Sequence, residues 1–157
     1  MMLEIAVPGA QSLRFDHLVA DFNGTLAIDG VLISGVAEAL RSLSARLEIH
    51  VITADTFGTA RQAVAGIACT TTVLSPGDQD SAKLRYVERL GAAHCVCIGN
   101  GRNDRSMLAA AGLGIAVLQG EGAAVETLLA AKVAAPDIGA ALGLLINPAR
   151  LVATLRV

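Results

Sequence analysis

The segment ADFNGTLAIDG, residues 20–30, decides how the rest of the chain is interpreted. Asp21 lies near the end of the apolar run FDHLVADF, residues 15–22, which is typical of a buried strand. Gly24 and Thr25 follow closely, and a carboxylate at a strand end beside Gly-Thr is a suitable place for a nucleophile that handles phosphate. Asn23 stands between them, so the chemistry of an amide at this position bears on whether the protein is an enzyme.

Outward from this segment, apolar runs typical of strands alternate with segments of helical periodicity. Further strands are expected in 48–55, 71–75, 95–100, 113–119 and 132–135, and helices in 34–47, 56–65, 80–90, 104–112, 123–131 and from Pro136-Asp137 onward. Ser34 is the expected cap of the first helix, and residues 1–9 alternate like an edge strand. This alternation predicts an α/β fold, a three-layer doubly wound and mostly parallel sheet with helices on both faces.

Length and composition favour a single core domain over residues 1–157, because 157 residues with 54% hydrophobic content can bury one sizeable core. A net charge of −2 without a basic stripe makes nucleic acid a poor partner. No apolar run reaches the roughly 18 residues of a membrane span, and no signal-peptide pattern follows Met1, so a cytoplasmic protein is expected. The high hydropathy hints at an oligomer.

Polar residues just after the apolar runs are the candidate site, because ligands of such sheets bind beyond the carboxyl ends of the strands. They are Asp21, Asn23 and Thr25 after the first run, Thr53, Ala54 and Asp55 after the second, and Gly99, Asn100, Gly101, Arg102, Asn103 and Asp104 after the fourth, with Lys83 on the preceding helix. The three histidines, His17, His50 and His94, show no metal-ligand spacing and are interpreted as incidental.

This set suits the transfer of a phosphoryl group, which needs an in-line nucleophile, a cation and fixed hydrogen-bond donors. Asp21 can act as nucleophile and form an aspartyl-phosphate, while Thr53 and Lys83 offer a hydroxyl and an ammonium. Gly24 allows the backbone to approach the phosphate. Mg²⁺ prefers oxygen ligands, and these could come from four residues: Asp21, Asn23 through its carbonyl, Asn100 and Asp104.

The segments DFNGTLA, VITAD with its Thr53, Lys83 and GNGRND resemble, in order, the four signature motifs of the haloacid dehalogenase-like (HAD) hydrolase superfamily. The resemblance covers about residues 15–135 and is nearest to small soluble proteins described as P-type-ATPase-like. It implies that the first aspartate is nucleophile and Mg²⁺ ligand, and that threonine and lysine hold the phosphoryl group. The expected phosphate-binding residues are Asp21, Phe22, Asn23, Gly24, Thr53, Ala54, Lys83 and Asn103.

Two positions depart from the phosphatase pattern of that superfamily. Asn23 stands where a phosphatase of the family carries its general acid and base, and Asn100 stands where it carries an aspartate that ligates Mg²⁺. An amide cannot exchange protons with the leaving group or with water, and such assistance is typically worth roughly 10²–10⁴-fold. Hydrolysis is therefore expected to be slow, and Mg²⁺ to be held mostly when phosphate is also present.

The spacing of the motifs leaves no room for a cap domain or an inserted nucleotide-binding domain. Residues 26–34, LAIDGVLIS, are predicted to form a short hairpin flap with its turn at Asp29-Gly30. Capless relatives such as the sugar-acid phosphatases use such a flap to build a homotetramer. The resemblance therefore implies a homo-oligomer, with a tetramer as the expected form.

Three hypotheses follow. The first is a slow Mg²⁺-dependent phosphohydrolase for a small phosphorylated substrate. The second is a catalytically degenerate protein that binds phosphate or a partner at the same rim. The third is a protein whose oligomer surface is its function.

Overall fold

A computed structural model describes residues 2–55 and 58–157 of the chain. Its centre is a six-stranded sheet in which all neighbouring strands run parallel. The strand order is β10 (Val133–Ala135), β9 (Leu113–Val117), β8 (Cys95–Gly99), β3 (His17–Asp21), β6 (Glu48–Thr53) and β7 (Cys69–Val73). The chain therefore winds outward in one direction from β3 and, after β7, returns to continue in the other, as predicted for a doubly wound sheet.

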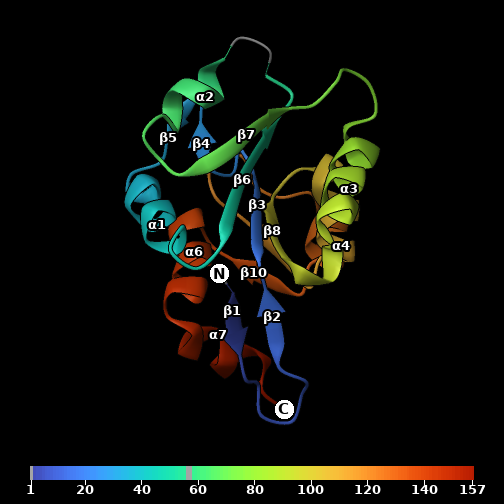
Figure 1. Ribbon diagram of the computed structural model, residues 1–157. Helices are drawn as coiled ribbons and strands as arrows, with labels where there is room; N and C mark the ends of the chain where they lie inside the picture. Colours follow the sequence, from blue (N-terminus) through green and yellow to red (C-terminus); the bar gives the residue numbers. More distant parts are fainter. Residues whose placement is uncertain (1, 56–57) are drawn as a thin grey trace.

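Helices cover both faces of this sheet, which gives the three layers predicted from the sequence (Figure 1). One face carries α1 (Val36–Leu43), α6 (Ile138–Ile146) and α7 (Pro148–Leu155), and the short α2 (Thr59–Ala63) adds Ala60 to the same core. The other face carries α3 (Gln79–Leu90), α4 (Arg105–Ala110) and α5 (Val125–Ala130). Two short 3₁₀ turns, η1 (Ala92–His94) and η2 (Arg102–Asp104), flank β8. The predicted start of the second helix at Thr56 lies outside the described residues.

The central strands are apolar along nearly their whole length because both of their faces are covered. All five residues of β8 and all five of β9 are buried, and so are four of the five residues of β3. Cys95 and Cys97 are buried in β8 as small core residues, and neither is in a disulfide.

The first residues of the chain do not join the main sheet as an edge strand. Instead β1 (Leu3–Ile5) pairs antiparallel with β2 (Leu13–Phe15) as a separate two-stranded hairpin. Leu3 and Ile5 enter the core while Glu4 faces solvent beside Arg14, so the alternation seen in the sequence belongs to this hairpin.

Two helix boundaries differ from the sequence expectation. Gly35, with a φ of 88°, is the N-cap of α1 and supplies no side-chain bond, so the expected cap at Ser34 was wrong. The predicted C-terminal helix begins after its cap Asp137, but Pro148 divides it into α6 and α7. Within the described residues no single helix is long and apolar enough to cross a membrane, and α6 and α7 meet that test only as a pair bent by 98°.

The hairpin flap predicted after the first motif is present. It consists of β4 (Ala27–Ile28) and β5 (Val31–Leu32), which pair antiparallel. Asp29 and Gly30 form its turn with φ values of 51° and 78°, the two positive angles of a type I′ hairpin. No further domain is inserted in the parts of the chain that are described, so the flap is the only structure between β3 and α1.

Candidate active site

The candidate site lies where the order of strands reverses, between β3 and β8. A cavity of about 230 Å³ opens there at the carboxyl ends of the strands. Its lining consists of Asp21, Asn23, Thr53, Ala54, Gln79, Lys83, Asn100, Gly101, Asn103 and Glu121. Eight of these residues belong to the set predicted from the sequence: Asp21, Asn23, Thr53, Ala54, Lys83, Asn100, Gly101 and Asn103.

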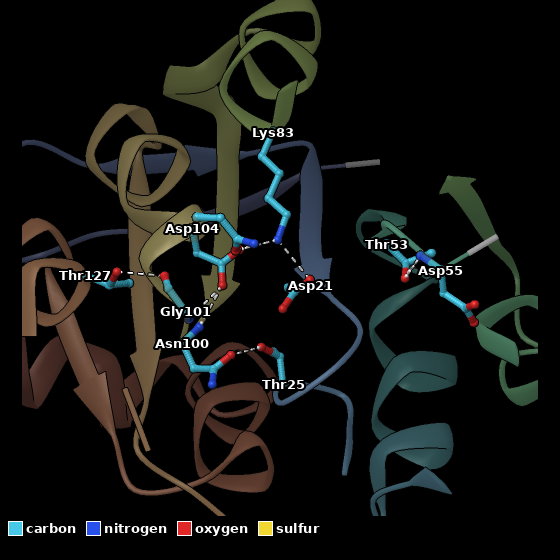
Figure 2. Close-up of polar contacts among 10 residues, drawn as sticks. Asp21, Thr25, Thr53, Asp55, Lys83, Asn100, Gly101, Asp104 and Thr127 are labelled. Carbon is cyan, nitrogen blue, oxygen red and sulfur yellow. Dashed lines mark hydrogen bonds and ion pairs between the residues drawn. The ribbon is translucent and has the colours of Figure 1, made fainter. Parts of the chain in front are cut away.

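Lys83 reaches from α3 to the end of β3 and joins the motifs to one another (Figure 2). Its ammonium donates to Asp21 Oδ1 at 3.0 Å, to Asp104 Oδ1 at 2.8 Å and to Asn103 Oδ1 at 3.0 Å. The lysine is only 2% exposed, so all three of its N–H groups have protein acceptors in place of water.

Asp104 is fully buried and supports the loop after β8 from within. Its Oδ1 accepts from Lys83, and its Oδ2 accepts the backbone N–H groups of Asn100 and Gly101, both at 3.0 Å. Both carboxylate oxygens are therefore occupied, and the side chain does not line the cavity. Direct ligation of a metal by Asp104 stays a prediction, and it would use the second lone pair of Oδ1 together with a shift of the side chain toward the cavity.

The negative charge of this cluster exceeds what one ammonium balances. Burial and then the charge of Asp104 raise the pKa of Asp21 to about 7, although Lys83 acts in the opposite direction. Burial alone lowers the pKa of Lys83, but the two carboxylates outweigh it and raise that pKa above its ordinary value. A site with this surplus of buried negative charge favours a cation beside Asp21.

The loop after β3 is packed tightly against the loop after β8. Asn100 Oδ1 accepts from Thr25 Oγ1 at 3.3 Å, and Asn100 Nδ2 donates to the carbonyl of Gly122 at 3.0 Å. Gly24 has a φ of 80°, and a Cβ there would lie 2.5 Å from Glu121 Oε2 and 2.9 Å from Asn100 Nδ2. Glycine is favoured at this position, because an L side chain would be strained at this φ and its Cβ would force the side chains of Glu121 and Asn100 to shift.

Thr53 lies at the end of β6, across the cavity from Lys83. Its hydroxyl accepts the N–H of Asp55 at 3.0 Å and so keeps its own hydrogen as a donor for another oxygen. Phe22 is fully buried, so only its main chain could contribute to the phosphate binding predicted for it.

Two lining residues, Gln79 and Glu121, were absent from the candidate set, and Gly101 was in it without an assigned role. Glu121 brings a further carboxylate against Gly24. It follows β9 by four residues, and an acidic residue this close to the carboxyl end of a parallel strand is a signal that could identify it. Gln79 opens α3, and nothing in its sequence context distinguishes it from a surface residue.

The donors present fit Mg²⁺. The lining residues include Asp21 and Glu121, which carry carboxylates, and Asn23 and Asn100, whose carbonyl groups supply further oxygens. Hard divalent cations prefer oxygen ligands, and Mg²⁺ commonly uses only one or two carboxylates together with water and phosphate oxygens.

A sequence model of haloacid dehalogenase-like hydrolases matches residues 83–133 of the chain. An uncharacterized protein from Methanocaldococcus jannaschii is 42% identical over 84 residues, which cover 51% of this chain and 90% of that protein.

Solved structures extend the likeness beyond the matched segment. A 3-deoxy-D-manno-octulosonate 8-phosphate phosphatase from Moraxella catarrhalis, in complex with magnesium, phosphate and KDO, superposes with a TM-score of 0.71 over 90% of this chain and 94% of its own, at 16% identity. A zinc-transporting PIB-type ATPase superposes with a TM-score of 0.58 over 78% of this chain and 20% of the pump, at 25% identity. The first likeness concerns the fold, and the second concerns one part of a much longer protein.

Proposed function

The chain belongs to the haloacid dehalogenase-like hydrolase superfamily, and we propose that it is a slow, Mg²⁺-dependent phosphohydrolase that acts on a small phosphomonoester. The observation that carries the proposal is the placement of Asp21 in the cavity at the strand switch point, with its carboxylate held by Lys83 at 3.0 Å. A fixed carboxylate beside a buried cation is the arrangement that attack on a phosphoryl group needs.

In the first step, an Asp21 carboxylate oxygen forms a bond to phosphorus while the ester P–O bond breaks. The leaving alkoxide takes a proton from water, because Asn23 has none to give. Lys83 orients the attacking carboxylate and balances charge on the phosphoryl oxygens, and Thr53 donates its hydroxyl hydrogen to one of them.

In the second step, water attacks the phosphorus of the aspartyl-phosphate and the acyl-phosphate bond breaks. This releases inorganic phosphate and restores the Asp21 carboxylate. No general base at position 23 removes the proton of the attacking water, so this step loses roughly 10²–10⁴-fold, about 3–5 kcal/mol of barrier. A long-lived aspartyl-phosphate is the consequence.

Asp21, the Asn23 carbonyl and Asn100 would hold Mg²⁺, with Asp104 behind them, and Glu121 adds a carboxylate at the same place. When bound, the ion would offset negative charge between the carboxylates and the phosphoryl oxygens.

The test is Mg²⁺-dependent release of phosphate from a panel of phosphomonoesters and acetyl phosphate. The wild type should turn over slowly, Asp21→Asn should be inactive, and Asn23→Asp should be faster by up to roughly 10²–10⁴-fold. Asp16→Asn is a matched control, since Asp16 precedes the opposite end of β3 and pairs at the surface with His94. Turnover by Asp21→Asn equal to that of the wild type would refute Asp21 as nucleophile.

A second function, phosphate or partner binding without turnover, is favoured by Asn100. Its amide oxygen accepts from Thr25 and its amide nitrogen donates to the carbonyl of Gly122, so the side chain ties two loops together and brings no charge to the cavity. Binding of phosphate and Mg²⁺ by wild type, without turnover by either wild type or Asn23→Asp, would select this function.

We also propose a cytoplasmic homo-oligomer, a tetramer assembled through the flap. Its support is strand β5 of the flap, in which Val31 is 70% exposed. A light-scattering mass equal to that of one chain would contradict this assembly.

A further inference from the structure

A second cluster of polar side chains lies at the other end of the sheet from the candidate active site. His17 is the first residue of β3, and Glu48 and His50 belong to the start of β6. His17 pairs with Glu48 across the two parallel strands, and Glu48 and His50 are two residues apart, so all three side chains point to the same face. Asp21 is four residues further along β3, about 13 Å away at the usual rise of a strand.

Three ligand atoms of this cluster converge. His17 Nδ1 lies 3.1 Å from His50 Nε2 and 3.0 Å from Glu48 Oε2, and His50 Nε2 lies 3.9 Å from the same oxygen. Two ligands of a tetrahedral Zn²⁺, each about 2.0–2.1 Å from the ion, are separated by about 3.3 Å. The three measured distances scatter around that value, so the atoms already form one face of such a tetrahedron.

The orientation of the His50 ring is fixed by a hydrogen bond on the ring nitrogen that faces away from the cluster. Its Nδ1 lies 2.8 Å from the hydroxyl of Tyr86 on α3, and that hydroxyl lies 3.3 Å from Thr72 Oγ1. With Nδ1 as the donor to Tyr86, the lone pair of Nε2 points toward His17 and Glu48. Histidines that bind metals are commonly held in this way by a second hydrogen bond on the other ring nitrogen.

Access and burial also suit a bound ion. The side chain of His50 is 8% exposed and that of His17 16%, whereas that of Glu48 is 62% exposed. The two imidazoles therefore lie on the buried side of the cluster and the carboxylate on its exposed side. An ion can enter from the exposed side, and water can occupy its fourth coordination position there.

We propose that His17, Glu48 and His50 form a transition-metal site that is separate from the candidate active site and binds Zn²⁺ or Co²⁺ in preference to Mg²⁺. Two imidazole nitrogens with one carboxylate suit these ions, whereas Mg²⁺ requires oxygen ligands. Because the ligands come from β3 and β6, and Tyr86 from α3, a bound ion ties two strands and a helix together. Sequence spacing alone did not find the site, since its histidines are 33 residues apart and meet only across the sheet.

The test is titration of the full chain with Co²⁺ in excess Mg²⁺, followed by visible absorption and competition with Zn²⁺. One equivalent of Co²⁺ should bind with a visible band and be displaced by Zn²⁺. His17→Gln and Glu48→Gln should weaken binding at least tenfold. Tyr86→Phe removes no ligand atom but deletes the hydrogen bond to His50 Nδ1, and it should weaken binding by roughly 10–100-fold.

Two controls locate the ion. His94→Gln removes a half-exposed histidine outside the cluster, and Asp21→Asn alters the candidate active site, and both should keep the band. Circular dichroism checks that each variant folds. A band lost in Asp21→Asn but kept in His17→Gln would place the ion at the active site, and equal affinity of wild type and His17→Gln would likewise overturn the proposal.

Discussion

Lys83 holds together the parts of the candidate site that come from different segments of the sequence. It bonds to the ends of β3 and η2 while buried beneath the cavity, and its two carboxylate partners are 12% and 0% exposed. Removing the ammonium would leave the charges of Asp21 and Asp104 buried without a partner. The free-energy cost of such unpaired charges exceeds the net stabilisation that a buried ion pair provides.

Lys83→Met should therefore lower the free energy of unfolding by about 3–5 kcal/mol, measured by urea denaturation. The matched control is Lys132→Met at the chain's other lysine, whose ammonium is bonded to the carbonyl of Gly112 at 2.7 Å near the surface. That variant should lose about 1 kcal/mol. Similar losses in the two variants would argue against a central role for the buried ion pairs.

Gly24→Ala tests the close packing of the two loops at the site. Its φ of 80° costs an alanine about 1–2 kcal/mol, and the new Cβ also crowds Glu121 and Asn100. Gly35→Ala is the control, because Gly35 has a φ of 88° and a Cβ there meets nothing within 4 Å. Both should lose similar backbone stability, but only Gly24→Ala should weaken binding of Mg²⁺ with phosphate, measured calorimetrically. Equal binding by the two variants would contradict the described packing.

At the scale of elements, α3 is the one that delivers Lys83, and its N-cap fixes where it begins. Asp78 Oδ1 accepts the N–H of Ser81 at 3.2 Å, and Oδ2 accepts the hydroxyl of Ser81 at 2.8 Å. The hydroxyl first and then the N–H hold the pKa of Asp78 below its ordinary value of 3.8.

Because this pKa is lower in the folded state, the stabilisation is present above about pH 3.8 and is lost as the pH falls through the folded pKa. Asn caps as well as Asp but does not titrate. The melting temperature of Asp78→Asn should therefore fall less steeply below pH 3.8 than that of the wild type. Parallel curves in thermal scans from pH 5 to pH 2.5 would show that Asp78 contributes nothing to the acid sensitivity.

The regular elements could be predicted because their signals are local. The I′ turn at Asp29-Gly30 and the buried run of β8 each depend on a few adjacent residues. The pairing of β1 with β2 could not, since a short alternating strand fits a sheet edge as well as a hairpin. Gly35, and not Ser34, is the N-cap of α1, because the residue before this helix has a left-handed backbone conformation. The presence of a serine in the sequence does not indicate which residue adopts that conformation.

At the scale of the whole molecule, the site exists only once the sheet has formed. The motif residues Asp21, Thr53 and Asn100 could be predicted to lie together because strand ends of a parallel sheet converge, and Lys83 could be added because its helix leads into β8. How their bonds are distributed could not be predicted, since Asp104 faces inward to Lys83 and to backbone N–H groups instead of the cavity. Which carboxylates face the cavity depends on side-chain packing that sequence patterns do not encode.

Ligand binding should be visible in the stability of the entire fold, because whatever binds only the native state stabilises it. With the charge of the usual aspartate missing at Asn100, Mg²⁺ alone should raise the melting temperature little. Mg²⁺ with phosphate should raise it by more than the two separate shifts combined. Differential scanning calorimetry measures this, with EDTA reversing the effect, and strictly additive shifts would contradict joint binding.

The three hydrogen bonds of Lys83 also determine which ligands can bind to its ammonium group in the cavity. An ammonium has three hydrogens, and Asp21, Asn103 and Asp104 already occupy all of them. An arriving group must displace one acceptor, and the neutral amide oxygen of Asn103 is the weakest of the three competitors. A dianionic phosphoryl oxygen can win that competition, whereas an uncharged hydroxyl or carbonyl gains nothing by it. The cavity thereby discriminates by charge before shape is tested, so neutral isosteres of a phosphate ester should make poor inhibitors even when they fit.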